Sequence, residues 1–270
     1  MTALASVMDA GWSIVKRDAK IMLSYRLRSA AMLLSAFFSL TLFYYISRLV
    51  SVRQFASPDD YYAFAVIGLV ILQVINSVLQ TPSMTLRQEL VAGTFERIVL
   101  SPFGAVGGVI SVLVFPFILS LVLGIVMLAF ATLVFGVPVE WATVPLAVPT
   151  AALAALAFAP FGLLLLAVVL VVKQALGGAT WLIALISLVA GLYFPVTLLP
   201  DWIEWASEVQ PFTPAVDLMR NLLVGTELRD PAWSSVLKLA GFAAVLLPAG
   251  AWLTKVALRA ARRRGTIIEY

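Results

Sequence analysis

The sequence contains no cysteine and no histidine among its 270 residues. Disulfide bonds, thiolate nucleophiles and the usual zinc sites are therefore excluded. A serine–histidine–aspartate triad is excluded as well, because it needs an imidazole as its base. A phosphate-binding loop of the form G-x-x-x-x-G-K-[ST] does not occur, so the chain cannot hydrolyse ATP by that route. We expect no catalytic residue, no bound metal and no enzymatic activity.

Charge is also scarce. Only 12% of the residues are charged, 62% are hydrophobic, and the mean hydropathy is +1.04. Ordinary soluble domains do not have this composition. A helix that crosses a bilayer needs roughly 20 apolar residues. Six charge-free stretches can each supply such a helix, the last one by recruiting residues 233–237 before it: 29–47, 61–86, 98–139, 141–172, 174–200 and 239–254.

The basic residues indicate how these helices cross the membrane. Five Lys and Arg lie in the first 28 residues and five in the last 16. Basic residues favour the cytoplasmic side, so both ends are predicted to be cytoplasmic. If residues 98–139 held two spans, the chain would cross the membrane seven times and one basic end would lie outside. We therefore predict an all-α polytopic membrane protein with six transmembrane helices, at about 30–49, 61–80, 109–135, 144–172, 179–199 and 233–254.

The first 15 residues lack a basic leader before an apolar core and contain Asp9, so we expect no cleaved signal peptide. Apolar and basic positions alternate from Leu4 to Arg26 at helical spacing. This pattern predicts an amphipathic segment on the cytoplasmic leaflet. Two interpretations stay open for this segment, a plain membrane anchor and a docking element for a partner.

Three polar residues, Gln73, Asn76 and Gln80, share one face of the predicted second span. Polar groups are costly in hydrocarbon unless they are paired, so this face should look into the bundle. It either lines a substrate path or holds the helices together through hydrogen bonds.

A charged island, LRQELVAGTFERIVLSP, separates the second and third spans. Residues 83–90 favour a stiff helix, Gly93 allows a sharp turn, and Thr94 can cap the segment after it. The charges of Arg87, Glu89, Glu96 and Arg97 could meet the surface of a partner or simply face solvent. Because the spans contain no ionisable residue for proton or sodium coupling, a transporter built from this chain needs an outside energy source.

A second island, residues 201–231, is too polar to span the membrane but carries an apolar side rich in tryptophan. We predict two short amphipathic helices at the outer leaflet. No repeat is visible, and residues 1–270 are predicted to form a single domain.

These islands resemble the motifs of type 2 ATP-binding-cassette (ABC) exporter permeases, the ABC-2 type. R-x-E-x-x-x-G-T-F-E-R-I-V-L-S-P, starting at Arg87, is similar to the stretch after the family's second span. GLYFPVTLLPDWIEWA, with Pro195 and Pro200, and QPFTPAVDLMRNLLVG, with Pro211, Asp217 and Arg220, are similar to two further family stretches. The sequence departs mildly at Phe95, where Leu is commoner, and at Gln210, where Asn usually stands.

The resemblance implies a permease subunit in the cell membrane of a prokaryote, without a cofactor of its own. It implies a second permease copy, as a homodimer or with a similar partner, and two cytosolic ABC ATPase subunits that bind ATP and Mg. Residues 83–100 would hold the coupling helix, with Arg87, Glu89, Gly93, Thr94, Glu96 and Arg97. Residues 201–225, with Pro195 and Pro200 before them, would form external re-entrant helices.

The function implied is export by alternating access of a lipophilic or amphipathic cargo such as a drug, lipid, glycolipid or lipid-linked polysaccharide. Membrane lipids are expected partners and nucleic acid is not. The alternatives are a channel or carrier that works without an ATPase, and a membrane scaffold that transports nothing.

Overall fold

The computed structural model describes residues 3–50, 54–91, 93, 113–172 and 176–263. These residues form helices and connecting turns, without a strand in the described ranges. The predicted all-α polytopic fold is thereby confirmed. The elements are α1 (Ala3–Ser24), α2 (Arg26–Leu49), α3 (Pro58–Val91), α6 (Val114–Phe135), η1 (Trp141–Thr143), α7 (Val144–Val172), α8 (Leu176–Val189), η2 (Val196–Leu198), α9 (Asp201–Glu208), α10 (Phe212–Val224) and α11 (Ala232–Arg263).

Five of these helices are long and apolar enough to cross a membrane, within the described residues: α2, α3, α6, α7 and α11. The helix α8 is apolar but shorter. The predicted fifth span, 179–199, is wrong in its second half, because α8 ends at Val189. Gly191 follows with a φ of 70°, a left-handed conformation that breaks the helix. The count of six spans therefore stays a prediction.

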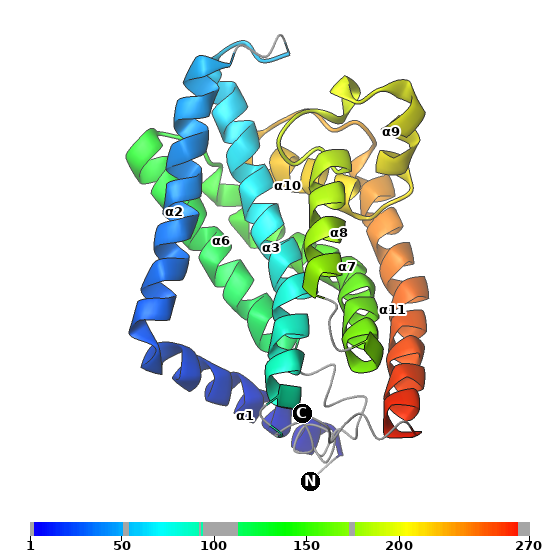
Figure 1. The fold of residues 1–270 in the computed structure, drawn as a ribbon. Helices are drawn as coiled ribbons and strands as arrows, with labels where there is room; N and C mark the ends of the chain where they lie inside the picture. The colour runs from blue at the N-terminus through cyan, green and yellow to red at the C-terminus, as the bar shows by residue number, and fades with distance from the viewer. Residues whose placement is uncertain (1–2, 51–53, 92, 94–112, 173–175, 264–270) are drawn as a thin grey trace.

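The helix α3 stands in the middle of the bundle (Figure 1). It packs against α2, α6, α7, α8 and α10, and every residue from Tyr61 to Ile71 is buried. A helix that is apolar all round belongs in the centre of a bundle, and this run is apolar all round. In contrast, α2 and α11 expose large apolar side chains such as Leu34 and Val245, as expected of helices that face lipid.

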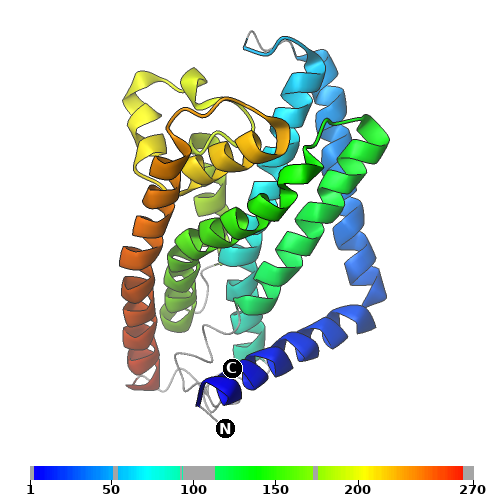
Figure 2. The same ribbon diagram turned by 180° about the vertical axis from the view of Figure 1, so that it is seen from behind.

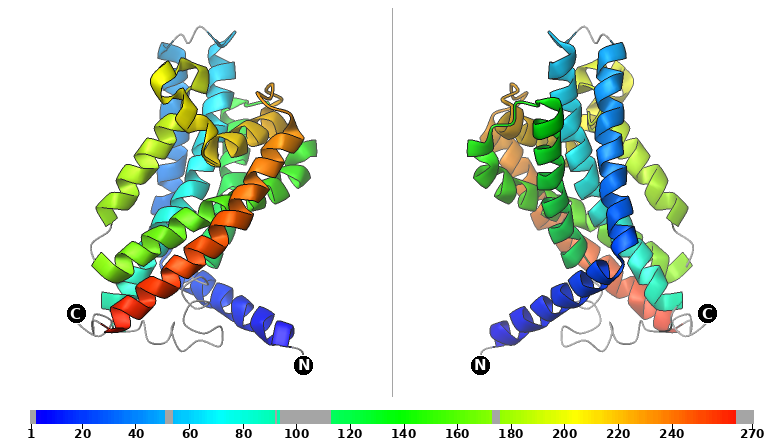
Figure 3. Two further views of the ribbon diagram at one scale, coloured as in Figure 1. Left: turned by 90° about the vertical axis from the view of Figure 1, so that its right-hand side faces the viewer. Right: turned by 90° about the vertical axis from the view of Figure 1, so that its left-hand side faces the viewer.

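The chain turns sharply between α1 and α2 (Figures 1 and 3). The turn lies at Tyr25, and the Ser29 hydroxyl donates a 2.9 Å hydrogen bond to the Met22 carbonyl across it. The amphipathic segment predicted near the start of the chain is therefore a helix of its own, set at an angle to the bundle.

The helices α9 and α10 lie at the end of the molecule opposite α1, and α10 runs across that end of the bundle (Figure 2). The two short helices predicted in 201–225 are thus present. The α6–α7 connection holds α10 in place, since the Glu140 N–H donates to the Leu223 carbonyl at 2.8 Å and the Thr143 hydroxyl donates to the Leu222 carbonyl.

Candidate functional site

The second predicted span and the helical part of the charged island form one helix, α3. It continues through Pro82, whose ring nitrogen cannot donate the usual hydrogen bond to the Val78 carbonyl. The backbone of α7 comes directly against that carbonyl. A Cβ placed on Gly162 would stand 2.3 Å from the Val78 oxygen, so only glycine allows this approach.

The end of α3 that carries the charged island, residues 83–91 with Gly93, is called the Gly93 end. Its apolar side, Leu86 and Leu90, is buried against the ends of α7 and α11. Its charged residues Arg87 and Glu89 are half-buried. Gly93 is exposed, has a φ of 67° and donates its N–H to the Leu90 carbonyl at 3.2 Å, which terminates the helix. Thr94, Glu96 and Arg97 lie outside the described residues.

The three amides of the predicted polar face have different surroundings. The Asn76 side chain donates a 3.0 Å hydrogen bond to the Leu72 carbonyl of its own helix. The Gln80 amide lies 3.4 Å from the Thr180 hydroxyl of α8, so it joins two helices. Gln73 is half-buried. At Gln80 the hydrogen bond agrees with the bundle-holding interpretation, and a substrate path stays a prediction.

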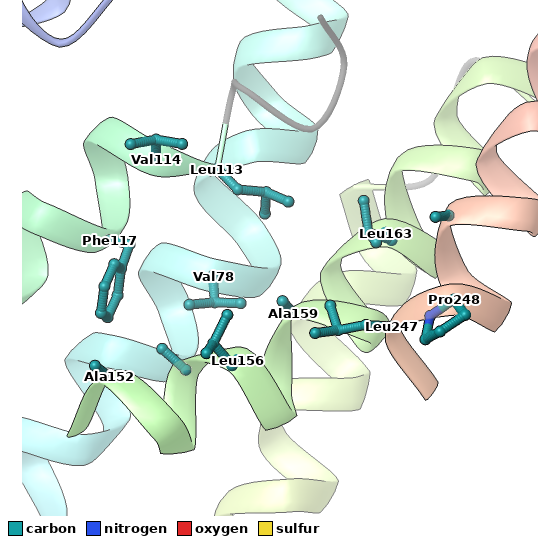
Figure 4. Close-up of a pocket in the computed structure, with 12 residues that line it drawn as sticks. Val78, Leu113, Val114, Phe117, Ala152, Leu156, Ala159, Leu163, Leu247 and Pro248 are labelled. Carbon is teal, nitrogen blue, oxygen red and sulfur yellow. The ribbon is translucent and has the colours of Figure 1, made fainter. Parts of the chain in front are cut away.

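An apolar groove of about 460 Å³ opens on another face of α3 (Figure 4). It lies between α3, α6, α7 and α11, and none of the three amides lines it. Its lining has no polar side chain, so it suits hydrocarbon. The lining residues are Val78, Leu113, Val114, Phe117, Ala152, Ala155, Leu156, Ala159, Leu163, Leu247, Pro248 and Ala251.

Three prolines of the predicted external region each stand directly before a helical segment. Pro195 precedes η2, Pro200 precedes α9 and Pro211 precedes α10. Their fixed φ angles, between −58° and −78°, suit a helix start. These residues therefore define where the short helices begin.

Arg220 of α10 lies inside the bundle, with only 3% of its surface exposed. Its Nε donates to the Phe64 carbonyl of α3 at 3.3 Å, and its Nη2 donates to the Leu192 carbonyl at 3.0 Å. The guanidinium also lies 3.3 Å from the centre of the Phe64 ring. Two carbonyls and an aromatic face compensate in part for burying the charge. Burial lowers the pKa of Arg220 to about 9, so it remains protonated at neutral pH.

Gly68 completes this arrangement. A Cβ at Gly68 would stand 1.8 Å from the Leu192 oxygen, the same oxygen that accepts from Arg220. The Tyr61 hydroxyl donates to the neighbouring Tyr193 carbonyl at 3.2 Å. The group formed by Phe64, Gly68, Leu192 and Arg220 is called the Arg220 knot. It ties α10 and the segment after α8 to α3.

The sequence assigned Arg220 and Asp217 to this region but missed Phe64, Gly68 and Leu192. One signal was available, because Val216, Arg220 and Leu223 share a face of α10 on which both neighbours are apolar. An arginine on such a face either lies buried among the apolar side chains or extends its guanidinium beyond them. The Leu192 contact is made by a backbone carbonyl, which leaves no trace in the sequence.

The described residues hold no group of three or more His, Cys, Asp or Glu that could bind a metal ion. A family model described as ABC-2 family transporter protein matches residues 47–252. The matched part runs from the end of α2 into α11 and contains the Arg220 knot and the Gly93 end. No curated protein matches the chain.

Proposed function

The chain belongs to the ABC-2 family of transporter proteins, and on that premise we propose that it is the permease of an ATP-driven exporter. It is a multi-pass membrane protein and a permease subunit of an ABC transporter. The proposal adds a homodimer, or a pair with a similar chain, in the cell membrane of a prokaryote, with both termini cytoplasmic. Two separate ATPase subunits would bind ATP and Mg and supply the energy.

The continuity of α3 carries the proposal. Its 34 residues correspond to a rod of about 51 Å, at 1.5 Å per residue. One end of the rod carries Arg87, Glu89 and the exposed Gly93 turn, and the other end is held in the Arg220 knot. A push on the Gly93 end would therefore reach α10 through a single helix.

The proposed mechanism is alternating access. Closure of the ATPase pair moves the Gly93 end, α3 carries the movement past Gly162 to the Arg220 knot, and α10 shifts with it. The path across the membrane then opens on the other side. Cargo would be lipophilic or amphipathic, and the wholly apolar lining of the groove in Figure 4 supports that class.

The proposal is tested by charge reversal at Glu89. The full-length chain is tagged in its own host and purified with its bound subunits, and Mg-ATP hydrolysis is measured in proteoliposomes. We expect Glu89→Lys to lower hydrolysis about tenfold, because it reverses the charge that this position presents to the proposed partner. Glu227→Lys is the matched control, since Glu227 is exposed at the far end of the molecule. It should leave hydrolysis unchanged.

The outcomes separate the proposal from its alternatives. A wild-type chain that purifies without any ATPase, yet passes substrate across the vesicle membrane, would identify a channel or carrier. A chain with neither activity would point to a scaffold. Equal hydrolysis by Glu89→Lys and the wild type would show that the Gly93 end does not couple the permease to ATP hydrolysis.

A further inference from the structure

A second cavity, of about 330 Å³, lies at the opposite end of the molecule from the Gly93 end. It is bounded by α9, α10, the loop before α11 and the first turns of α11. In contrast to the apolar groove, its walls carry three carboxylates, two cations and several hydroxyls. The charged lining residues are Glu208, Asp217, Asp230, Arg229 and Lys238.

Both cations of this cavity already have carboxylate partners. The Lys238 ammonium donates to Asp230 at 2.6 Å, and this hydrogen bond lowers the pKa of Asp230. Arg229 lies 3.6 Å from Glu204 of α9. Among the described residues, none forms a hydrogen bond or ion pair with the Asp217 carboxylate. Since Glu208 is a further carboxylate, the cavity has an excess of negative charge.

Ser235 provides a second, independent observation. Its side chain lines the cavity, only 3% of its surface is exposed, and its hydroxyl has no hydrogen-bond partner in the described ranges. The Ser235 hydroxyl is accessible from the cavity rather than sealed within the protein. The neighbouring Ser234 hydroxyl makes the usual bond back to the Pro231 carbonyl, at 2.9 Å, and the Ser235 hydroxyl does not. A hydroxyl kept free at a cavity wall is available to a ligand.

We propose that this cavity binds a primary ammonium group, with the Asp217 carboxylate and the Ser235 hydroxyl as acceptors. An ammonium has three N–H donors and a positive charge, which suits a carboxylate and a hydroxyl that form no hydrogen bond with the described residues. A bare metal ion fits less well, because the described residues contain no cluster of three metal-binding side chains. The proposal does not rest on the exporter function.

The surroundings agree with an amine at membrane-interface depth. Three tryptophans on the same elements, Trp202, Trp205 and Trp233, are each more than 60% exposed. Exposed tryptophans gather where the bilayer meets water. Burial raises the pKa of Asp217, although the nearby charges of Arg220, Arg229 and Lys238 oppose this shift. The amine could belong to a lipid head group or to a soluble molecule, and the two share the same chemistry.

A soluble probe tests the site first. The full-length chain, in a detergent without amines, is titrated with ethanolamine, choline and inorganic phosphate in a calorimeter. We expect saturable binding of ethanolamine and binding about tenfold weaker for choline, which has no N–H donor. Inorganic phosphate that binds as tightly as ethanolamine would overturn the assignment of a cation site.

Variants locate the binding. Asp217→Asn should weaken ethanolamine binding about tenfold and Ser235→Ala about threefold, as losses of one charged and one neutral hydrogen bond. Lys238→Gln should strengthen it several-fold, because it removes a competing cation and releases Asp230. Glu227→Gln, at an exposed carboxylate outside the cavity, is the matched control and should bind as the wild type does. Wild-type affinity in both Asp217→Asn and Ser235→Ala would overturn the proposal.

A lipid probe identifies the source of the amine. The same variants are placed in nanodiscs of phosphatidylethanolamine or phosphatidylcholine, and the lipids retained on release are counted by native mass spectrometry. If the wild type retains phosphatidylethanolamine and Asp217→Asn does not, the amine belongs to a lipid head group. Ethanolamine binding without lipid retention would assign a soluble amine. No saturable binding in either arm would overturn the site.

Discussion

The two ends of α3 are held in different ways. At the Arg220 knot, a buried guanidinium donates to the Phe64 and Leu192 carbonyls, and Gly68 lies against the same Leu192 oxygen. At the Gly93 end, one side of the helix packs through aliphatic side chains, while a Cβ added to Gly93 would meet no described residue within 4 Å. Directional hydrogen bonds fix the geometry of the groups that they join, whereas helices packed through aliphatic side chains can shift past one another in small shear movements. The difference suggests a helix that is free to move at the Gly93 end and that carries α10 with it at the knot.

The largest expected effect on stability comes from Arg220→Met, which removes the guanidinium from the Arg220 knot. The Leu192 carbonyl then loses its donor, and the contact with the Phe64 ring loses its charge. The lost contacts should lower the free energy of unfolding by about 3 kcal/mol. Part of this loss is recovered, because the methionine variant no longer buries a charge. Thermal unfolding in detergent measures it. Arg229→Met is the control, because Arg229 and Glu204 are each more than a third exposed and should matter little.

A smaller effect is expected from Gly68→Ala. The added methyl would stand 1.8 Å from the Leu192 oxygen, so the segment after α8 must move away from α3. Overpacking of this kind costs about 2 kcal/mol. Gly241→Ala in α11 adds the same methyl into open space and should be neutral or slightly stabilising. Equal melting temperatures for the two variants would show that α3 and Leu192 are not in close contact.

The smallest effect on stability is expected at the other end, from Gly93→Ala. No described residue lies within 4 Å of the added methyl, and the left-handed φ of 67° opposes it at about 1 kcal/mol. Hydrogen exchange should show faster opening of the last turn of α3, while the melting temperature falls by no more than about 2 °C. A melting temperature as low as that of Gly68→Ala would mean that both ends are held alike.

Sequence reasoning found the helices and the islands because hydropathy and charge are local properties. It placed a stiff helix at 83–90 and a turn at Gly93, and both are present in α3 and after it. It extended the fifth span too far, because the apolar run continues past Val189 although Gly191 and Pro195 end the helix. That prediction gave more weight to the apolar composition of the segment than to Gly191 and Pro195, which disfavour a helix.

The contacts that organise the candidate site were less accessible. Gly68 and Gly162 look like ordinary glycines in apolar helices, and their meaning appears only when Leu192 and Val78 present backbone oxygens to them. The partners of Arg220 are also backbone carbonyls, from residues 28 and 156 positions away. Backbone contacts of this kind carry no residue preference, so one sequence cannot predict them.

The central claim is that α3 moves as one piece between the Gly93 end and the Arg220 knot. The chain has no cysteine, so spin labels at Asp60→Cys and Gln88→Cys, both exposed on α3, report without background. Their backbones should lie about 42 Å apart at 1.5 Å per residue. Measured by double electron–electron resonance during ATP-driven turnover, with one labelled copy per complex, this distance should not change. A shorter distance during turnover would mean that α3 bends at Pro82, and would contradict the account.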